Sequence, residues 1–159
     1  NSTNQSVVLQ EFTKLTGGID LLLIFISFLF YFLFGYLMYS SLFAAVGSAV
    51  DAEADTQQFM LPITIPLIFS FLLIQPVMDN PDGILAFWLS IIPLTSPIIM
   101  MARLPFGVEN WQLILSMIIL IVGFIGTTFL AAKIYRTGIL MYGKKISYKE
   151  LWKWLTYKG

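Results

Sequence analysis

The sequence contains no cysteine and no histidine among its 159 residues. These absences exclude disulfide bonds, thiol catalysis, zinc sites built from Cys and His, and every mechanism that requires an imidazole. Charge is also scarce, since Asp, Glu, Lys and Arg make up 11% of the chain, against about 25% in soluble domains. Apolar residues make up 58%, and the mean hydropathy is +0.83. This charge cannot cover a water-facing surface, and we expect an integral membrane protein.

The few charges are distributed unevenly along the chain. Residues 133–159 carry seven basic residues against one acidic residue, a net charge of +6, and residues 1–132 carry a net charge of −6. Beside long apolar runs, a basic excess of this kind indicates the cytoplasmic side of a membrane. We therefore expect a cytoplasmic C-terminus and no nucleic-acid partner. Because the chain begins with Asn1 and shows no basic leader with a cleavage site, we also expect a fragment of a longer protein.

Four stretches lack any charged residue, and each reaches the length of about 20 residues that a spanning helix needs. They are residues 21–50, 56–78, 83–102 and 110–132. The first and the last are uniformly apolar and predict two clear spans. The second contains three prolines, which are tolerated in a span when neighbours satisfy the freed carbonyls, and predicts a kinked span. These prolines are Pro62, Pro66 and Pro76.

Small residues recur every four positions in the first and last stretches. Such stripes let helix backbones approach closely in lipid, so we interpret them as packing faces. The stripes are Ala45 with Ala49, or Ala44 with Ser48, in the first stretch, and Gly123, Thr127 and Ala131 in the last.

The third stretch is different because Pro93 and Pro97 lie at its centre. Each proline removes a backbone donor and disfavours helix in the residue before it. Two breaks four residues apart leave halves that are too short to span, and they favour a re-entrant pair of half-helices over one kinked span. Pro93 and Pro97 are therefore candidate gating prolines. Broken backbone at membrane depth is tolerated only inside protein or beside a wet cavity.

A re-entrant pair determines the topology. Residues 1–18 are then external, residues 19–140 form the membrane part, and residues 141–159 form a cytoplasmic amphipathic tail. The acidic turn at residues 51–58 also lies in the cytoplasm. If the third stretch instead crosses fully, the acidic turn moves outside and the N-terminus moves inside.

The tail contains a helical pattern with Ser147 and Glu150 at the spacing of a capping box. One face is apolar and the lysines lie off it, which predicts an interfacial helix with its apolar side in the headgroups. The apolar face is formed by Tyr148, Leu151, Trp152 and Leu155. The candidate membrane anchors are Trp152, Trp154, Lys149 and Lys153.

Residues that carry chemistry are almost absent. Asp51, Glu53 and Asp55 alternate like calcium ligands, but the required glycine is replaced by Thr56, so we reject that site. They form either a solvated turn or a contact surface for a cytoplasmic partner. No ionisable group lies within the four stretches, which argues against a self-contained ion-coupled carrier or an intramembrane enzyme. Arg103, just beyond the third stretch, is expected to snorkel at the outer rim, and a contact at a pore mouth is the alternative.

Two runs of the sequence are distinctive. The first extends from Phe34-Gly-Tyr through Phe43-Ala-Ala-Val-Gly-Ser-Ala-Val-Asp51 to Glu53-Ala-Asp-Thr-Gln-Gln-Phe-Met-Leu-Pro62. The second extends from Ile92-Pro-Leu-Thr-Ser-Pro to Arg103-Leu-Pro105 and continues after the last span as Ala132-Lys-Ile-Tyr-Arg. Together they resemble the permease subunits of type-2 ATP-binding-cassette (ABC-2) exporters, with the NatB-like, sodium-extrusion branch as the nearest. The resemblance covers most of residues 19–140, the C-terminal portion of such a permease.

The apolar runs, the proline break and the amphipathic tail predict an all-α membrane protein with three spans, a re-entrant pair and an interfacial helix. The resemblance implies a subunit in the cytoplasmic membrane of a bacterium that forms a route with a second permease. A separate ATPase would bind ATP, so no cofactor or catalytic residue is expected in this chain. The ATPase-facing loop would contain Asp51, Glu53, Asp55 and Gln57. The alternative is a non-transporting assembly or scaffold protein that works through its C-terminal helix.

Overall fold

The computed structural model describes residues 6–8, 10, 17, 20–50, 53–140 and 147–156. Within these ranges the chain forms helices joined by turns, with no strand. The long helices are α2 (Leu21–Ala49), α3 (Glu53–Leu72) and α7 (Asn110–Leu140). The shorter ones are α4 (Ile74–Asp79), α5 (Ile84–Ile91), α6 (Ser96–Arg103), the 3₁₀ turn η1 (Leu104–Phe106) and α8 (Tyr148–Thr156).

Among the described residues, α2 and α7 are the two helices long and apolar enough to span a membrane. Only 22% and 17% of their most apolar windows is buried inside the protein, whereas a helix in the core of a soluble protein is mostly buried. Large apolar side chains such as Phe32, Val122 and Phe129 are exposed on them. These surfaces are suited to lipid. The first and last sequence stretches therefore form apolar helices as expected, although α7 continues to Leu140, eight residues beyond the predicted stretch.

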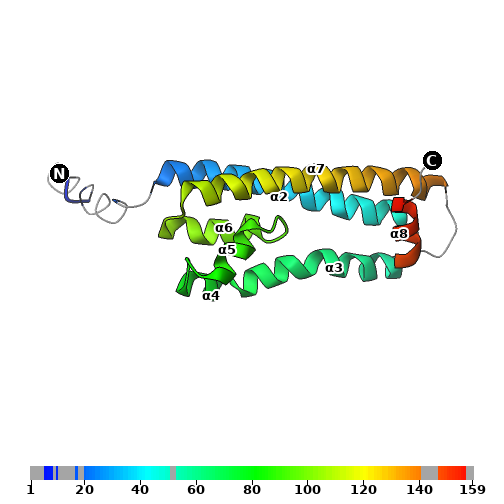
Figure 1. Cartoon of the computed structure of the whole chain (residues 1–159), viewed down its shortest axis with the longest axis horizontal. Helices are drawn as coiled ribbons and strands as arrows, with labels where there is room; N and C mark the ends of the chain where they lie inside the picture. Colours follow the sequence, from blue (N-terminus) through cyan, green and yellow to red (C-terminus); the bar gives the residue numbers. More distant parts are fainter. Residues whose placement is uncertain are drawn as a thin grey trace.

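α2 and α7 lie side by side and run in the same direction (Figure 1). Three contacts show the direction, because they advance together along both helices. The hydroxyl of Tyr31 bonds that of Ser116, Ser41 bonds Thr127, and a Cβ on Gly138 would lie 2.7 Å from the carbonyl oxygen of Ser48. The chain between the two helices must therefore return from the end of α2 to the start of α7.

α3 makes this return. It stays helical through Pro62 and Pro66, and the interruption falls at Leu73, between α3 and α4. Pro76 explains this position, because a proline cannot donate to the carbonyl four residues before it. The prolines thus divide the second stretch into a 20-residue helix and a short one.

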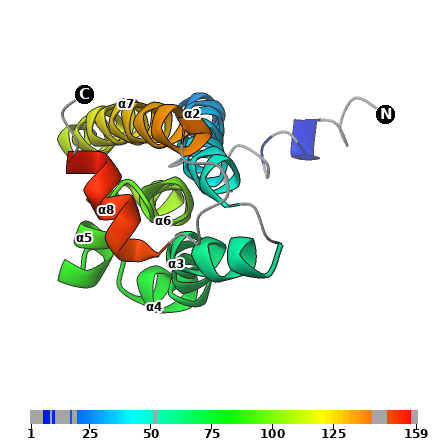
Figure 2. The same ribbon diagram turned by 90° about the vertical axis from the view of Figure 1, so that its right-hand side faces the viewer.

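α6 lies at the centre of the bundle and contacts α2, α3, α4, α5 and α7. Seen along the bundle, it lies between the α2–α7 pair and the α3–α4 side, while α8 crosses the end (Figure 2). The main apolar core is built from α2, α6 and α7. Its buried members are Tyr31, Met38, Tyr39, Met100, Leu104, Leu113 and Leu120.

Candidate functional site

The third sequence stretch forms a helical hairpin, α5 and α6, that enters the bundle and comes back. Phe87 of α5 lies beside Trp111 at the start of α7, and the turn residue Pro93 packs against Gly123 of the same helix. Arg103, at the end of α6, returns to bond Gln112. The twelve residues from 111 to 123 correspond to about 18 Å of helix. The hairpin thus reaches well into the interior.

Both prolines of the turn fit against glycines on the long helices. A Cβ on Gly35 of α2 would lie 3.0 Å from Cβ and Cγ of Pro97, and a Cβ on Gly123 of α7 would lie 3.0 Å from Cβ of Pro93. A larger side chain at either glycine would collide with a rigid ring. Pro93, just after α5, and Pro97, in the first turn of α6, therefore also hold the turn between α2 and α7.

Hydrogen bonds satisfy the carbonyls that the break exposes. The Tyr39 hydroxyl of α2 donates to the carbonyl of Leu94, and the Thr95 hydroxyl donates to the carbonyls of Leu89 and Ile92. A buried backbone acceptor without a partner costs free energy, so these bonds make a broken helix tolerable inside the bundle.

Arg103 is the largest fully buried side chain among the described residues, with 2% of its surface exposed. Its Nε donates to the carbonyl of Pro81 at 2.7 Å, Nη1 to the Ser90 hydroxyl at 2.6 Å, and Nη2 to the Gln112 side chain at 3.0 Å. The expectation that Arg103 snorkels outward is wrong. Its guanidinium holds α6 to α5, to α7 and to the turn before α5.

The same network continues to α2. The Ser116 hydroxyl donates to the Ser90 carbonyl at 2.6 Å and lies 2.9 Å from the Tyr31 hydroxyl, which donates to it. Tyr31, Ser90 and Ser116 are all buried. Because buried polar groups are costly when unpaired, this chain of bonds strongly favours one arrangement of the hairpin.

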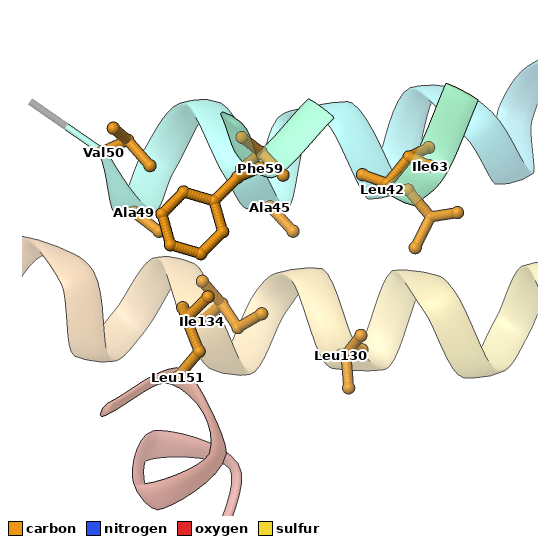
Figure 3. Close-up of a pocket in the computed structure, with 10 residues that line it drawn as sticks. Leu42, Ala45, Ala49, Val50, Phe59, Ile63, Leu130, Ile134 and Leu151 are labelled. Atoms are coloured by element: carbon orange, nitrogen blue, oxygen red, sulfur yellow. The ribbon is translucent and has the colours of Figure 1, made fainter. Parts of the chain in front are cut away.

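The opposite end of the bundle is closed by α8. Trp154 is 5% exposed and packs with Ala45, Ala49 and Ile134. Beside this cluster is an apolar pocket of about 110 Å³, where Phe59 and Leu151 meet the small residues of α2 (Figure 3). Of the two small-residue stripes predicted in α2, Ala45 with Ala49 is the packing face, and Ala44 is exposed.

The faces of α8 differ from those expected. Leu151, Leu155 and Trp154 face the bundle, whereas Trp152 is 71% exposed, with Lys149 and Lys153 also exposed. Of the four predicted anchors, Trp154 is therefore part of the core of the protein. The sequence pattern placed Trp152 on the apolar face and Trp154 off it, and this was wrong because nothing in the sequence shows which side of α8 meets α2 and α7.

Two further contacts fix α8 in place. The Lys133 ammonium donates to the carbonyl of Leu155 near the end of α8, where a cation is favoured by the helix dipole. Tyr148, at its start, donates to the carbonyl of Gln58, and its ring lies 4.5 Å from that of Phe59. α8 therefore joins the ends of α2 and α7 to the start of α3.

The predicted acidic loop lies partly outside the described residues. Asp51 is among those not described, and Glu53 begins α3, although its side chain is not described. Asp55 and Gln57 are exposed on the first turns of α3, at the same end as α8. The structure thus brings two of the four candidate residues to the end that carries Lys149 and Lys153.

Sequence reasoning missed the residues that hold the α5–α6 hairpin against α2 and α7. Gly35, Tyr31, Ser90 and Ser116 are single small or polar residues inside apolar runs, and each also fits ordinary helix packing. Tyr31, Gly35 and Met38 are spaced three or four residues apart and share one buried face of α2. That periodicity was the available signal, but the partner of the face could not be read from it.

Two helices with surfaces suited to lipid, a broken hairpin packed between them and a helix across one end define a helical membrane protein. Residues 8–133 match the ABC-2 family transporter proteins. The chain therefore belongs to this family of transporter membrane components.

Two curated relatives support the match. The uncharacterized protein MJ1024 of Methanocaldococcus jannaschii is 31% identical over 100 residues, which cover 62% of this chain and 25% of the relative. The uncharacterized protein YhaP of Bacillus subtilis is 29% identical over 98 residues, which cover 61% of this chain and 23% of the relative. The chain thus spans about a quarter of the length of these relatives. No solved structure matches it.

Proposed function

We propose that the chain is the C-terminal membrane part of a permease subunit of an ATP-binding-cassette exporter. In this proposal α2, α3 and α7 cross the bilayer, α5 and α6 form a re-entrant pair, and α8 lies at the cytoplasmic face. The observation that carries it is the parallel direction of α2 and α7. Two parallel spans need one return crossing between them, and α3 supplies it, so α5 and α6 have to enter and leave on the same side.

The cytoplasmic end is assigned from charge. Lys133 and Arg136 at the end of α7, and Lys149 and Lys153 on α8, lie at the end of the bundle that bears Asp55. A basic excess beside apolar helices favours the cytoplasm. The hairpin then opens on the outer side of a prokaryotic cytoplasmic membrane, and the C-terminus lies inside.

The same end is the proposed docking surface for a separate ATPase that binds ATP. The surface is formed by Asp55 and Gln57 on α3 together with α8, and by Asp51 and Glu53 if the loop continues it. α8 contacts α3 and packs against the ends of α2 and α7. A movement of α8 caused by the ATPase would therefore be transmitted to all three spans. ATP hydrolysis would shift the populations of inward and outward states by moving these helices as rigid bodies.

A second permease subunit would complete the translocation route. The resemblance to ABC-2 permeases supports this, and the route is expected between two copies or two related chains. Pro93 and Pro97 are the proposed gating residues, because they hold the turn between α2 and α7. Sodium efflux is the first transport to assay, given the resemblance to NatB-like permeases.

The test is association with an ATPase. Affinity-tagged full-length protein is isolated from its native membrane in detergent and again in nanodiscs, and the eluate is examined for a subunit with Walker motifs. We expect a stoichiometric ATPase whose hydrolysis rate changes on binding. Absence of any ATPase under both conditions contradicts the proposal.

The alternative is a non-transporting scaffold that works through the outward face of α8. Its support is the exposure of Trp152 beside two lysines, a surface that a partner could bind. The two functions differ in the effect of the hairpin. A permease loses ATPase stimulation when Pro93 or Pro97 is replaced by alanine, whereas a scaffold loses partner binding only when the face of α8 is altered.

A further inference from the structure

A second cleft opens at the end of the bundle opposite α8, between α5 and the start of α7, with a volume of about 580 Å³. Three aromatic side chains line it. The ring of Phe87 lies 5.5 Å from that of Trp88 and 6.0 Å from that of Trp111. Trp88 is 58% exposed and Trp111 is 54% exposed, so both indoles present surface to a ligand.

The charges in this cleft are not balanced. Arg103 is the one cation among the described lining residues, against Asp82 and Glu109. The guanidinium already donates to three oxygens of the protein, none of them on Glu109. Glu109 therefore remains as an exposed carboxylate without a cationic partner among the lining residues, and the cleft is net negative.

Glu109 is held in position by its neighbours. The indole N–H of Trp111 donates to its carboxylate, and its carbonyl accepts from the backbone of Gln112 and Leu113, which begins α7. The preceding turn needs Gly107, whose φ of +84° is unfavourable for any residue with a side chain. The carboxylate is thus fixed beside an indole ring at the rim of the aromatic wall.

We propose that this cleft binds an organic cation, an ammonium group with apolar substituents. The positive charge would lie against Glu109 and the faces of Trp88 and Trp111, since aromatic faces attract cations. An anion is disfavoured because the cleft is net negative and each nitrogen of Arg103 already donates within the protein. A metal ion is disfavoured because no group of three or more acidic residues gathers in the described structure. The inference goes beyond the proposed function, since it requires neither an ATPase nor transport.

An ammonium group can come from two sources at this depth, a phospholipid headgroup or a free amphiphilic amine. Both ligands carry the positive charge and the alkyl groups that the cleft would recognise. The aromatic belt of membrane proteins also places tryptophan at this level without any specific ligand. Glu109 distinguishes a binding site from an aromatic belt. Tryptophans that only anchor the protein at the interface do so without a carboxylate, whereas binding of an ammonium group should depend on Glu109.

The test uses the full chain in phosphatidylglycerol nanodiscs with benzyltrimethylammonium as the probe and tryptophan fluorescence as the signal. The chain has four tryptophans, and a W152F background removes the exposed one on α8. Its buried neighbour Trp154 then serves as an internal reference. We expect saturable quenching by the cation, none beyond empty-disc partitioning by its neutral carbon isostere neopentylbenzene, and affinity about tenfold weaker in E109Q.

Asp79 provides the matched control, since it is an exposed carboxylate at the same end that does not line the cleft. D79N should bind the probe like the parent, and W111F should bind it more weakly. Equal binding of the cation and its isostere, or an unchanged affinity in E109Q, overturns the proposal. Discs of phosphatidylcholine identify the source once the probe concentration at the surface is matched from its partitioning into empty discs of each lipid, because anionic phosphatidylglycerol itself attracts the cation. At matched surface concentration, weaker probe binding in phosphatidylcholine indicates a headgroup in the cleft, and equal binding indicates that free cations alone enter it.

Discussion

The ring of Pro97 packs against Gly35 so closely that a Cβ on this glycine would lie 3.0 Å from two ring carbons. Pro93 has the same relationship to Gly123 on the other long helix. Each proline therefore has two effects: Pro93 lies in the break after α5 and Pro97 in the first turn of α6, and the rigid ring of each occupies the space left by a missing side chain. This pairing explains how a broken segment can lie at the centre of a bundle that otherwise consists of long helices.

Replacing Gly35 with leucine should destabilise the protein, because the proline ring cannot rotate away and the hairpin backbone must shift. Overpacking of this kind costs about 1–3 kcal/mol. The matched control is Gly126 on α7, where a Cβ meets nothing within 4 Å. Gly126→Leu should be neutral or stabilise by about 0.5–1 kcal/mol, since glycine is a weak helix former. Thermal unfolding in detergent compares the two variants. Equal losses of stability would contradict the close packing of Pro97 against Gly35.

Arg103→Lys should behave as a disruptive substitution. A lysine cannot reach the Pro81 carbonyl, Ser90 and Gln112 together, so buried partners are left unpaired. We expect a loss of about 2–4 kcal/mol in the free energy of unfolding. Arg136→Lys, at an exposed position near the end of α7, is the control and should change stability little. If unfolding in detergent shows similar stability for both variants, the guanidinium network does not hold the hairpin.

The two tryptophans of α8 should differ in their effect on stability. Trp154→Ala opens a cavity beside Ala45, Ala49 and Ile134 and should cost about 3–5 kcal/mol. Trp152→Ala removes an exposed ring and should leave the unfolding temperature almost unchanged. Differential scanning fluorimetry with an extrinsic dye measures both. A Trp152→Ala loss as large as that of Trp154→Ala would show that α8 packs through its other face.

The sequence predicted the elements better than their contacts. Runs without charge located α2 and α7, and the rule that proline breaks helices located the turn between α5 and α6, because both effects are local. The position of the second interruption was less clear, since Pro62 and Pro66 remain inside α3 whereas Pro76 is preceded by a break. Which proline a helix tolerates depends on the partners that satisfy its free carbonyl.

The candidate site depended on contacts that no single segment contains. Arg103 looked like a rim residue because it follows an apolar run, and its burial requires Ser90, Gln112 and the Pro81 carbonyl to converge from three elements. The amphipathic pattern put Trp152 and not Trp154 on the apolar face, and only the packing of α8 against α2 and α7 shows that Trp154 is the buried one. Gly123 and Thr127 were found as a stripe, but the proline ring and the Ser41 hydroxyl that occupy it lie far away in the sequence.

Single-cysteine labelling tests the proposed topology directly, and the absence of native cysteine makes each probe unambiguous. Gln57→Cys and Lys149→Cys are exposed at the α8 end, and Ile84→Cys is exposed at the start of the hairpin. In sealed vesicles, a membrane-impermeant maleimide should label the first two from the cytoplasmic side and the third from the outer side. Labelling of Gln57→Cys and Lys149→Cys from opposite sides would require α5 and α6 to cross the bilayer. That crossing would make α2 and α7 run in opposite directions across the bilayer, so the parallel contacts between them could not form. This one result would therefore refute both the membrane topology and the packing on which the permease proposal rests.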